Sequence, residues 1–245
     1  MTARATLATA RRVLTQLRRD HRTLGLLLIV PVLLITLLRY VYDDQPAVFD
    51  RAGGPLLALF PFVTMFLVTS VAMLRERSTG TLERLLTMPL GKGDLLAGYA
   101  LAFGLVALVQ TSIACAVALG LLGLDLAASP ALVLLLAVLD ALLGMALGLL
   151  LSAFARSEFQ AVQFLPAFVL PQLLLCGLLA DRDDMAAPLR WLSSALPLTY
   201  AVDGMQQLTA SSALSDDLVL DLAVISATCL LALALCALTL RRRSA

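Results

Sequence analysis

Few residues of this chain have the types and spacing that catalysis requires. The only histidine, His21, lies among arginines near the N-terminus, so a histidine-based zinc site or a serine hydrolase triad is not indicated. The pair Gly91 and Gly93 flanks Lys92, but the Gly-x-x-x-x-Gly-Lys-Ser/Thr spacing of a phosphate-binding loop is missing. We therefore expect no catalytic residue, no metal site and no bound cofactor in this chain.

One carboxylate, that of Asp140, is predicted to lie near the middle of a membrane-spanning helix. A charge at that depth is costly and usually faces protein or water. Asp140, Gly144 and Gly148 recur every four residues, so they share a face that favours close packing against another helix. Gln110 is expected at a similar depth on an adjacent antiparallel span. Two interpretations stay open: a structural Asp between helices, or a role in a path across the membrane. The variant Asp140→Asn separates them in part.

The elements that must hold these residues are membrane helices. The 245 residues are 60% hydrophobic and 14% charged, with a mean hydropathy of +0.94, whereas soluble domains are about half apolar and about a quarter charged. A hydrocarbon core of ~30 Å takes about 20 residues to cross. Six runs qualify, over approximately residues 24–42, 55–74, 95–122, 131–154, 159–179 and 218–240. The sequence predicts an all-α, polytopic membrane protein in which residues 1–245 form one domain.

Two further segments are predicted to be helical without crossing the membrane. Residues 1–23 combine a basic face with an apolar stripe of Leu7, Ala10, Leu14 and Leu17, which is typical of an interfacial helix on anionic lipid. It is either an anchor alone or also a contact for a cytoplasmic partner. Residues 181–217 are acidic and rich in proline, and we expect short helices there at the outer surface, partly re-entrant.

The distribution of basic residues predicts the orientation. Fourteen of the 18 Lys and Arg residues lie before the first span, between the second and third spans, between the fourth and fifth spans, or after the sixth span. The other four share their side of the membrane with eleven Asp. By the positive-inside rule, both termini and residues 75–98 are cytoplasmic, in the cell (inner) membrane.

Residues 75–98 form a polar segment with helical periodicity between two long apolar runs. The apolar residues Leu82, Leu85, Leu86 and Pro89 recur at helix spacing, and charged residues occupy the other faces. We expect a short amphipathic helix that Pro89 and the following glycines end. A helix of this kind is suited to docking a soluble partner at the membrane surface.

Two motifs suggest a family. Glu76-Arg-Ser-Thr-Gly-Thr-Leu-Glu-Arg-Leu-Leu-Thr-Met-Pro89, followed by Gly91, Asp94 and Gly98, resembles the pattern of ABC exporter permeases of the type-2 class. The segment from Pro188 to Met205 resembles the region before the last span of the same family. The chain departs from the pattern at Leu196, where Asn is usual, and at Tyr99, where Lys is frequent. The resemblance covers essentially the whole chain.

The resemblance implies a transport subunit that is not itself an enzyme. Such permeases work as dimers, identical or mixed, of six-span subunits, and each subunit binds a separate ATP-binding cassette ATPase that carries the ATP and Mg. The ATPase grips the loop between the second and third spans, here residues 75–98. The expected contact residues are Glu76, Gly80, Thr81, Leu82, Glu83, Leu85, Leu86 and Pro89. Membrane lipids are further expected partners, and nucleic acid is not.

Mechanically, the loop must act as a lever with a dry contact face, so Glu83→Lys or Leu86→Asp is expected to uncouple ATP hydrolysis from transport. Candidate residues for the translocation path or for helix packing are Gln110, Asp140, Gly144, Gly148, Pro166 and Pro171. The two prolines are either tolerated kinks or a hinge in the fifth span.

The leading hypothesis is the membrane subunit of an ATP-driven exporter. Few fixed charges lie in the spans, which favours an amphipathic or apolar substrate such as a drug, an antibiotic or a lipid. The alternatives are a permease-like assembly or anchoring subunit without a cargo, a polysaccharide or glycolipid exporter, and a proton-driven carrier that uses Asp140.

Overall fold

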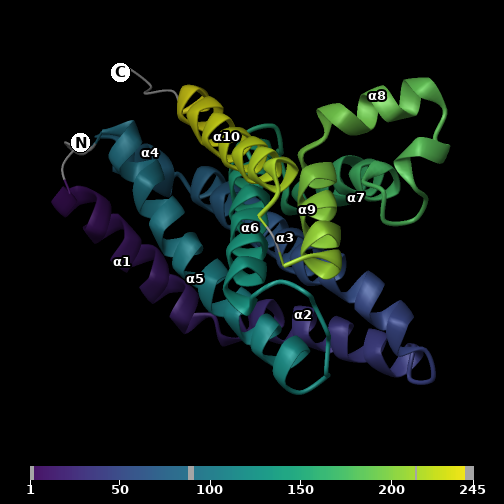
Figure 1. The fold of residues 1–245 in the computed structure, drawn as a ribbon. Coiled ribbons are helices and arrows are strands. Elements are labelled where there is room, and N and C mark those ends of the chain that lie inside the picture. The colour runs from purple at the N-terminus through teal and green to yellow at the C-terminus, as the bar shows by residue number, and fades with distance from the viewer. Residues whose placement is uncertain (1–2, 88–90, 213, 241–245) are drawn as a thin grey trace.

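The computed structural model describes residues 3–87, 91–212 and 214–240. This part of the chain is helical and has no strand (Figure 1). Six helices are long and apolar enough to cross a membrane, so the predicted all-α polytopic fold is confirmed. These spans are α2 (His21–Val41), α3 (Pro46–Ser78), α5 (Lys92–Gly120), α6 (Pro130–Leu151), α7 (Glu158–Leu175) and α10 (Asp216–Thr239). The shorter elements are α1 (Ala3–Arg19), α4 (Thr81–Thr87), the 3-10 turn η1 (Arg182–Asp184), α8 (Ala187–Ala195) and α9 (Pro197–Ala210).

The second span is longer than the sequence indicates. We expected it to begin near residue 55, but α3 begins at Pro46 and has 33 residues, which corresponds to about 50 Å at 1.5 Å per residue. Pro46 occupies the first turn, where a missing N–H costs nothing. Pro55 and Pro61 are both buried inside the helix, where neighbouring helices support the interrupted ladder.

The fifth span is a single helix. Pro166 and Pro171 lie inside α7, and the helix is continuous through both of them. It ends at Leu175, before Gly177 with its positive φ of 89°. Gly177 explains why the span is shorter than the predicted run to residue 179, because a left-handed residue cannot continue the helix.

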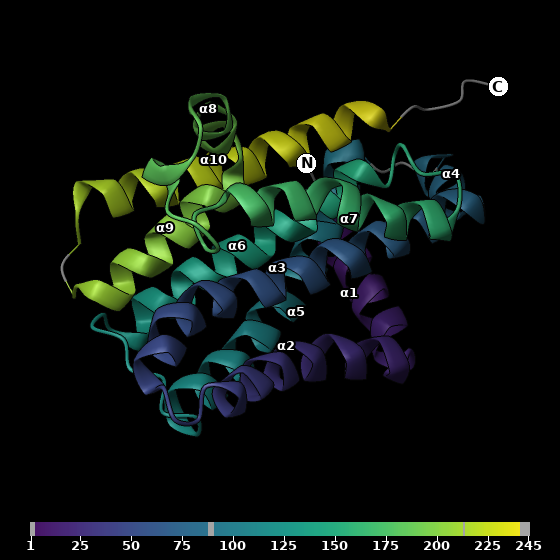
Figure 2. The same ribbon diagram turned by 90° about the vertical axis from the view of Figure 1, so that its right-hand side faces the viewer.

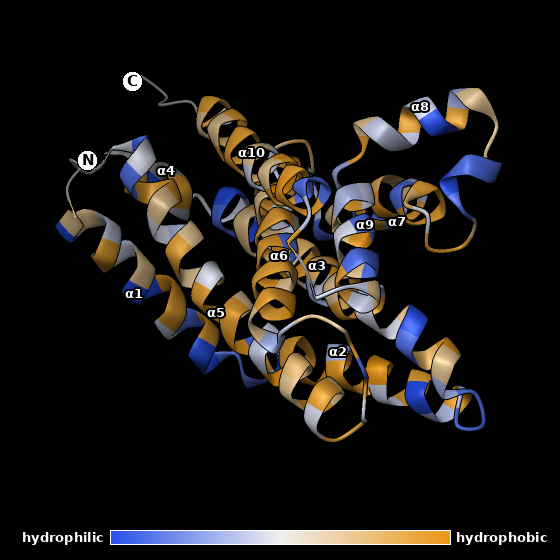
Figure 3. Cartoon of the chain, viewed as in Figure 1, coloured by the Kyte–Doolittle hydropathy of each residue, from blue (hydrophilic) through white to orange (hydrophobic). Residues whose placement is uncertain are grey.

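The core of the bundle is the packed pair α3 and α6, which both views place at its centre (Figures 1 and 2). In the span of α6, 67% of the residues are buried, against 17% in each of α2 and α7. The helices α2 and α7 therefore have far fewer buried residues than α6. Apolar residues dominate the spans, and polar residues gather at the helix ends and connections (Figure 3).

The N-terminal helix α1 packs against α5 instead of standing apart from the bundle. Gly98 of α5 makes this contact possible, because a Cβ there would lie 2.5 Å from Cβ of Thr9. The buried face consists of Thr6, Thr9, Ala10 and Val13. Of the predicted apolar stripe, Leu7 is 62% exposed, whereas Ala10 is buried and Leu14 and Leu17 pack against the core. The most buried face is thus turned toward Thr6 and Thr9, because small residues permit the closest approach of two backbones.

Residues 181–217 form η1, α8 and α9, and the two α-helices differ in their surroundings. α9 packs among α3, α6 and α10 with its apolar side buried. α8 stands away from the bundle (Figures 1 and 2), and its Trp191 is 82% exposed.

Candidate functional site

The loop between the second and third spans begins with a tight turn. α3 ends at Ser78, and the hydroxyl of Thr79 donates a hydrogen bond of 2.8 Å to the carbonyl of Arg75. Gly80 then adopts a φ of 69°, in the left-handed region that glycine enters without steric cost. The chain can therefore reverse within two residues, and α4 starts at Thr81.

The short helix α4 turns part of its apolar face inward. Leu82 is only 4% exposed and belongs to the core cluster, and the half-buried Leu85 packs against that cluster. Leu82 is thus turned into the core of this chain in this conformation, and a direct contact of Leu82 with the ATPase stays a prediction. Arg84 and Thr87 are exposed. Of the other expected contacts, Glu83 and Leu86 lie in α4 with side chains outside the described part, and Pro89 lies outside the described residues.

Directly before this turn, three consecutive residues of α3 bind three different parts of the bundle. We call Arg75, Glu76 and Arg77 the α3 anchor residues. Arg75 forms a bidentate ion pair with Glu158 at the start of α7, with Nε–Oε1 and Nη2–Oε2 distances of 2.7 Å and 3.1 Å. Arg77 donates from Nη2 to the hydroxyl of Thr239, at the end of α10, over 3.3 Å.

Glu76, the central anchor residue, faces α1 and α5. Its Oε1 lies 3.1 Å from Nη2 of Arg12, which also donates to the hydroxyl of Tyr99 over 2.6 Å. The Arg12 guanidinium is in addition 5.9 Å from the centre of the Tyr99 ring. The Glu76 side chain is only 11% exposed. In this structure the carboxylate is bound within the permease, and an ATPase contact at Glu76 stays a prediction.

Arg12 and Tyr99 were missed as members of this site. In the sequence, Arg12 is one of several arginines in a basic helix, and Tyr99 is marked only by its departure from the family pattern. No sequence spacing connects them with Glu76, because the three residues lie on separate helices.

The residues predicted for a path or for packing fall into two groups. Gly144 and Gly148 belong to the first group: a Cβ at either position would collide with a backbone carbonyl of α3, that of Phe62 or that of Phe66. Beside this contact, the hydroxyl of Thr69 lies 3.2 Å from the carbonyl of Met145. These glycines therefore let α3 and α6 approach at backbone contact distance.

The second group consists of polar side chains inside the spans. Asp140 is fully buried, and within the described chain neither of its carboxylate oxygens has a hydrogen-bond partner. Gln110 is also fully buried and donates to the hydroxyl of Thr64 over 2.5 Å. Gln110 is thus joined to α3 and not to Asp140. On α7, Gln172 is buried and accepts from the amide of Leu198 over 3.4 Å, while the adjacent Pro171 is exposed.

Comparisons with known proteins indicate the family of this chain. The family model described as ABC-2 type transporter matches residues 4–209. The chain is 28% identical over 169 residues to ABC transporter G family member 20 of Dictyostelium discoideum, a match that covers 69% of this chain and 23% of that protein.

Two bacterial relatives are permeases by name. Probable multidrug ABC transporter permease YbhR of Escherichia coli K12 is 30% identical over 161 residues, covering 66% of this chain and 44% of the relative. Inner membrane transport permease YhhJ of the same strain is 28% identical over 174 residues, covering 70% and 46%. This chain thus spans less than half the length of these curated relatives. Since the family model covers most of the chain, from α1 to α9, the protein belongs to the ABC-2 type transporter family of membrane permeases.

Proposed function

We propose that this permease is the membrane subunit of an ATP-driven exporter and that α4 docks a separate ATP-binding cassette ATPase. The observation that carries the proposal is the position of α4 directly after the α3 anchor residues. A push on α4 would reach α1, α5, α7 and α10 through these contacts. The ATP and Mg would be held by the partner subunit.

The contact surface that we propose on α4 is narrower than the one expected from sequence. Leu82 is turned inward, so the exposed Arg84 and Thr87 are the described side chains best placed to meet a partner. Arg84 would supply a charge that selects the register of docking, and Leu82 would transmit the motion into the core.

The proposed cargo is an amphipathic or apolar molecule such as a drug, an antibiotic or a lipid. The named relative YbhR is described as a probable multidrug permease. Among the described residues of the spans, Asp94 and Asp221 are buried near the start of their helices, and Asp140 is the acidic side chain that is buried near the middle of a span. A path with so few fixed charges suits apolar cargo better than a polyanion. We propose a dimer of permease subunits around this path.

The docking proposal is tested by co-purification with the ATPase subunit. The variant Arg84→Glu is expected to lower recovery of the ATPase by about tenfold, since reversing an interfacial charge costs more than 1.4 kcal/mol. Arg51→Glu is the matched control: it reverses an equally exposed charge near the opposite end of α3 and should leave recovery unchanged. Equal losses for the two variants, or no loss for Arg84→Glu, would contradict docking at α4.

A further inference from the structure

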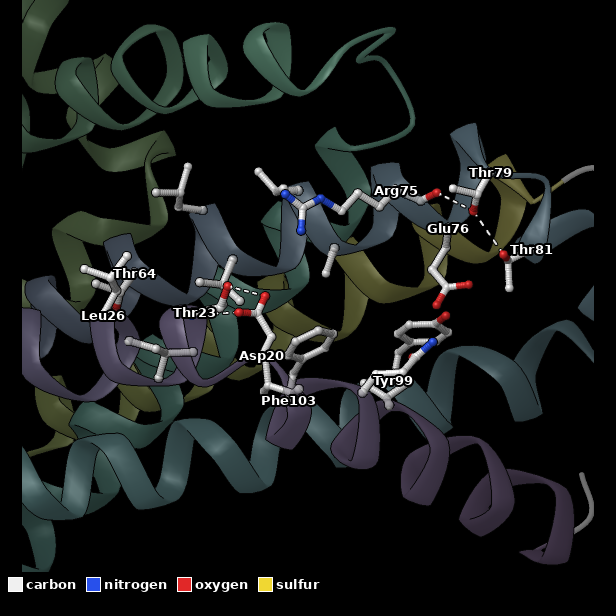
Figure 4. A pocket seen from close by; sticks show the side chains of 18 of the residues that line it. Asp20, Thr23, Leu26, Thr64, Arg75, Glu76, Thr79, Thr81, Tyr99 and Phe103 are labelled. Carbon is white, nitrogen blue, oxygen red and sulfur yellow. Dashed lines mark hydrogen bonds between the residues drawn. The ribbon is translucent and has the colours of Figure 1, made fainter.

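A cavity of about 570 Å³ lies between α2 and α3, and residues of α1 and α5 complete its lining (Figure 4). We call it the α2–α3 cavity. Its walls are mainly aliphatic and aromatic, and include Leu26, Val30, Leu67, Val68, Val71 and Phe103. None of the contacts described above fills this space.

The polarity of the cavity changes along its length. On α3 the lining residues extend from Thr64 to Thr79, a rise of about 22 Å at 1.5 Å per residue. Between Thr64 and Ala72 the α3 residues that line the cavity after Thr64 are all apolar. This stretch rises about 12 Å, close to one leaflet, or about half of the ~30 Å hydrocarbon core. Arg75, Glu76 and Thr79 line the end near α4. A molecule that fits must be an amphiphile whose polar end lies toward α4.

The acidic group at this end is Asp20, the N-cap of α2. Its carboxylate accepts from the amide and the hydroxyl of Thr23 over 3.1 Å and 2.7 Å. These hydrogen bonds lower the pKa of Asp20 below its usual value, so the group is ionised at neutral pH. Within the described residues, no cation lies at ion-pair distance from it.

The basic group is Arg75, whose side chain and that of Asp20 lie on opposite walls of the cavity (Figure 4). Glu158 occupies Nε and Nη2 of Arg75. In the part of the chain that is described, Nη1 makes no hydrogen bond. Glu76, the other charged lining residue, is neutralised by Arg12. Among the described residues, the cavity mouth therefore presents one carboxylate that has no ion-pair partner and one guanidinium N–H that makes no hydrogen bond.

We propose that the α2–α3 cavity binds a zwitterionic phospholipid with a primary ammonium, as in an ethanolamine headgroup, from the leaflet on the α4 side. One acyl chain lies between α2 and α3, the ammonium binds Asp20, and the phosphate accepts from Nη1 of Arg75. A quaternary ammonium cannot donate a hydrogen bond to Asp20, and an anionic headgroup without an amine brings a second negative charge beside it. The site is independent of ATPase docking and of the identity of the cargo.

Binding is measured by native mass spectrometry of the purified full chain, titrated with ethanolamine, choline and glycerol phospholipids of identical acyl chains. One ethanolamine lipid per chain is expected to bind about tenfold more tightly than the other two, as for a charge-assisted hydrogen bond. In Asp20→Asn this preference is lost, while Asn keeps the helix cap. Asp44→Asn, which removes an exposed carboxylate between α2 and α3, should keep the preference.

Occupancy of the cavity is tested by filling it. Val68→Trp places a large ring among the lining residues and should abolish binding of the ethanolamine lipid. Ile29→Trp is the control: it adds the same ring to a position of α2 that is 61% exposed and does not line the cavity. If Val68→Trp does not fold, lipid binding is tested instead by the melting temperature of the unsubstituted protein, because a bound lipid raises the melting temperature. The ethanolamine lipid must then raise the melting temperature more than the choline lipid does.

Three results would overturn the proposal. The first is equal affinity for the three phospholipids, and the second is unchanged binding in Val68→Trp. The third concerns dodecylammonium, an amphiphile that has no phosphate. The proposal fails if dodecylammonium binds tightly, displaces the phospholipid, and binds equally well to the Arg75→Gln variant. That result would identify the cavity as a site for cationic amphiphiles. Loss of ATPase recovery in Arg84→Glu has no bearing on any of these measurements.

Discussion

At the scale of single residues, the α3 anchor residues explain how one helix end can hold several others. An α-helix has 3.6 residues per turn, so consecutive side chains leave it about 100° apart. Arg75, Glu76 and Arg77 therefore point in three directions and reach α7, α1 with α5, and α10. Of the two ion pairs, the one between Arg75 and Glu158 is about half exposed and contributes little to the stability of the protein. The pair between Glu76 and Arg12 is more buried, and we expect it to contribute more to stability.

Removal of Arg12 should destabilise the protein more than removal of its neighbour. Arg12→Ala leaves the Glu76 carboxylate and the Tyr99 hydroxyl without their donor, at a cost of about 1–3 kcal/mol. This corresponds to a fall in melting temperature of roughly 3–10 °C. Arg11→Ala, at an exposed position of the same helix, should change it by less than about 2 °C. Similar melting curves for the two purified variants would show that the contact at Arg12 carries no stability.

At the scale of elements, the pair α3 and α6 determines the spacing of the bundle. Lipid chains are as apolar as leucine, so helices in a membrane associate through close packing more than through the hydrophobic effect. Gly144 and Gly148 provide that packing, because their faces lie directly on the α3 backbone at Phe62 and Phe66. Asp140 lies one turn before Gly144 on the same helix and is fully buried. Its environment therefore depends on this spacing.

A single added methyl group should separate these two helices. In Gly144→Ala the new methyl group would overlap the backbone carbonyl of Phe62. A backbone carbonyl cannot move aside as the end of a flexible side chain can. We expect a loss of about 1–3 kcal/mol, the usual cost of overpacking. Gly120→Ala adds the same atom at the end of α5, where nothing lies within 4 Å, and should be neutral or slightly stabilising. Size-exclusion profiles after a heating series compare the two variants, and equal survival would contradict close packing at Gly144.

At the scale of the whole molecule, α4 and the end of α10 lie at the same end of the bundle in both views (Figures 1 and 2). The α3 anchor residues occur at this end as well. We propose that it is cytoplasmic, because the basic residues are concentrated in the connections that lie there. The same orientation would place α8, with its exposed Trp191, toward the opposite side of the membrane.

Cysteine labelling tests this orientation. Asp44→Cys, between α2 and α3, should react in intact cells with a maleimide that does not cross membranes. Thr87→Cys, at the exposed end of α4, should react only after the cells are opened. Three native cysteines are buried and Cys229 is half-buried, so the unsubstituted chain should give a low background. The reverse pattern of labelling would show that the protein is inserted the other way.

The sequence alone determined the class of the protein and its elements. Six apolar runs of sufficient length predict six spans because the bilayer has a known thickness and leaves the backbone no alternative to a helix. The motif from Glu76 to Pro89 likewise indicated the family. These are local properties: length, periodicity and residue type are all visible in a single stretch of chain.

Which residues meet depends on how the helices pack. In the folded bundle, Leu82 faces inward, Arg12 joins Glu76 to Tyr99, α3 begins as early as Pro46, and the α2–α3 cavity is present. The hydrophobic pattern of the sequence does not predict these features, because both the core and the lipid-facing surface of a membrane protein consist of apolar side chains. Which face of each helix is buried depends instead on small residues such as Gly98 and Gly144, whose partners lie on other helices.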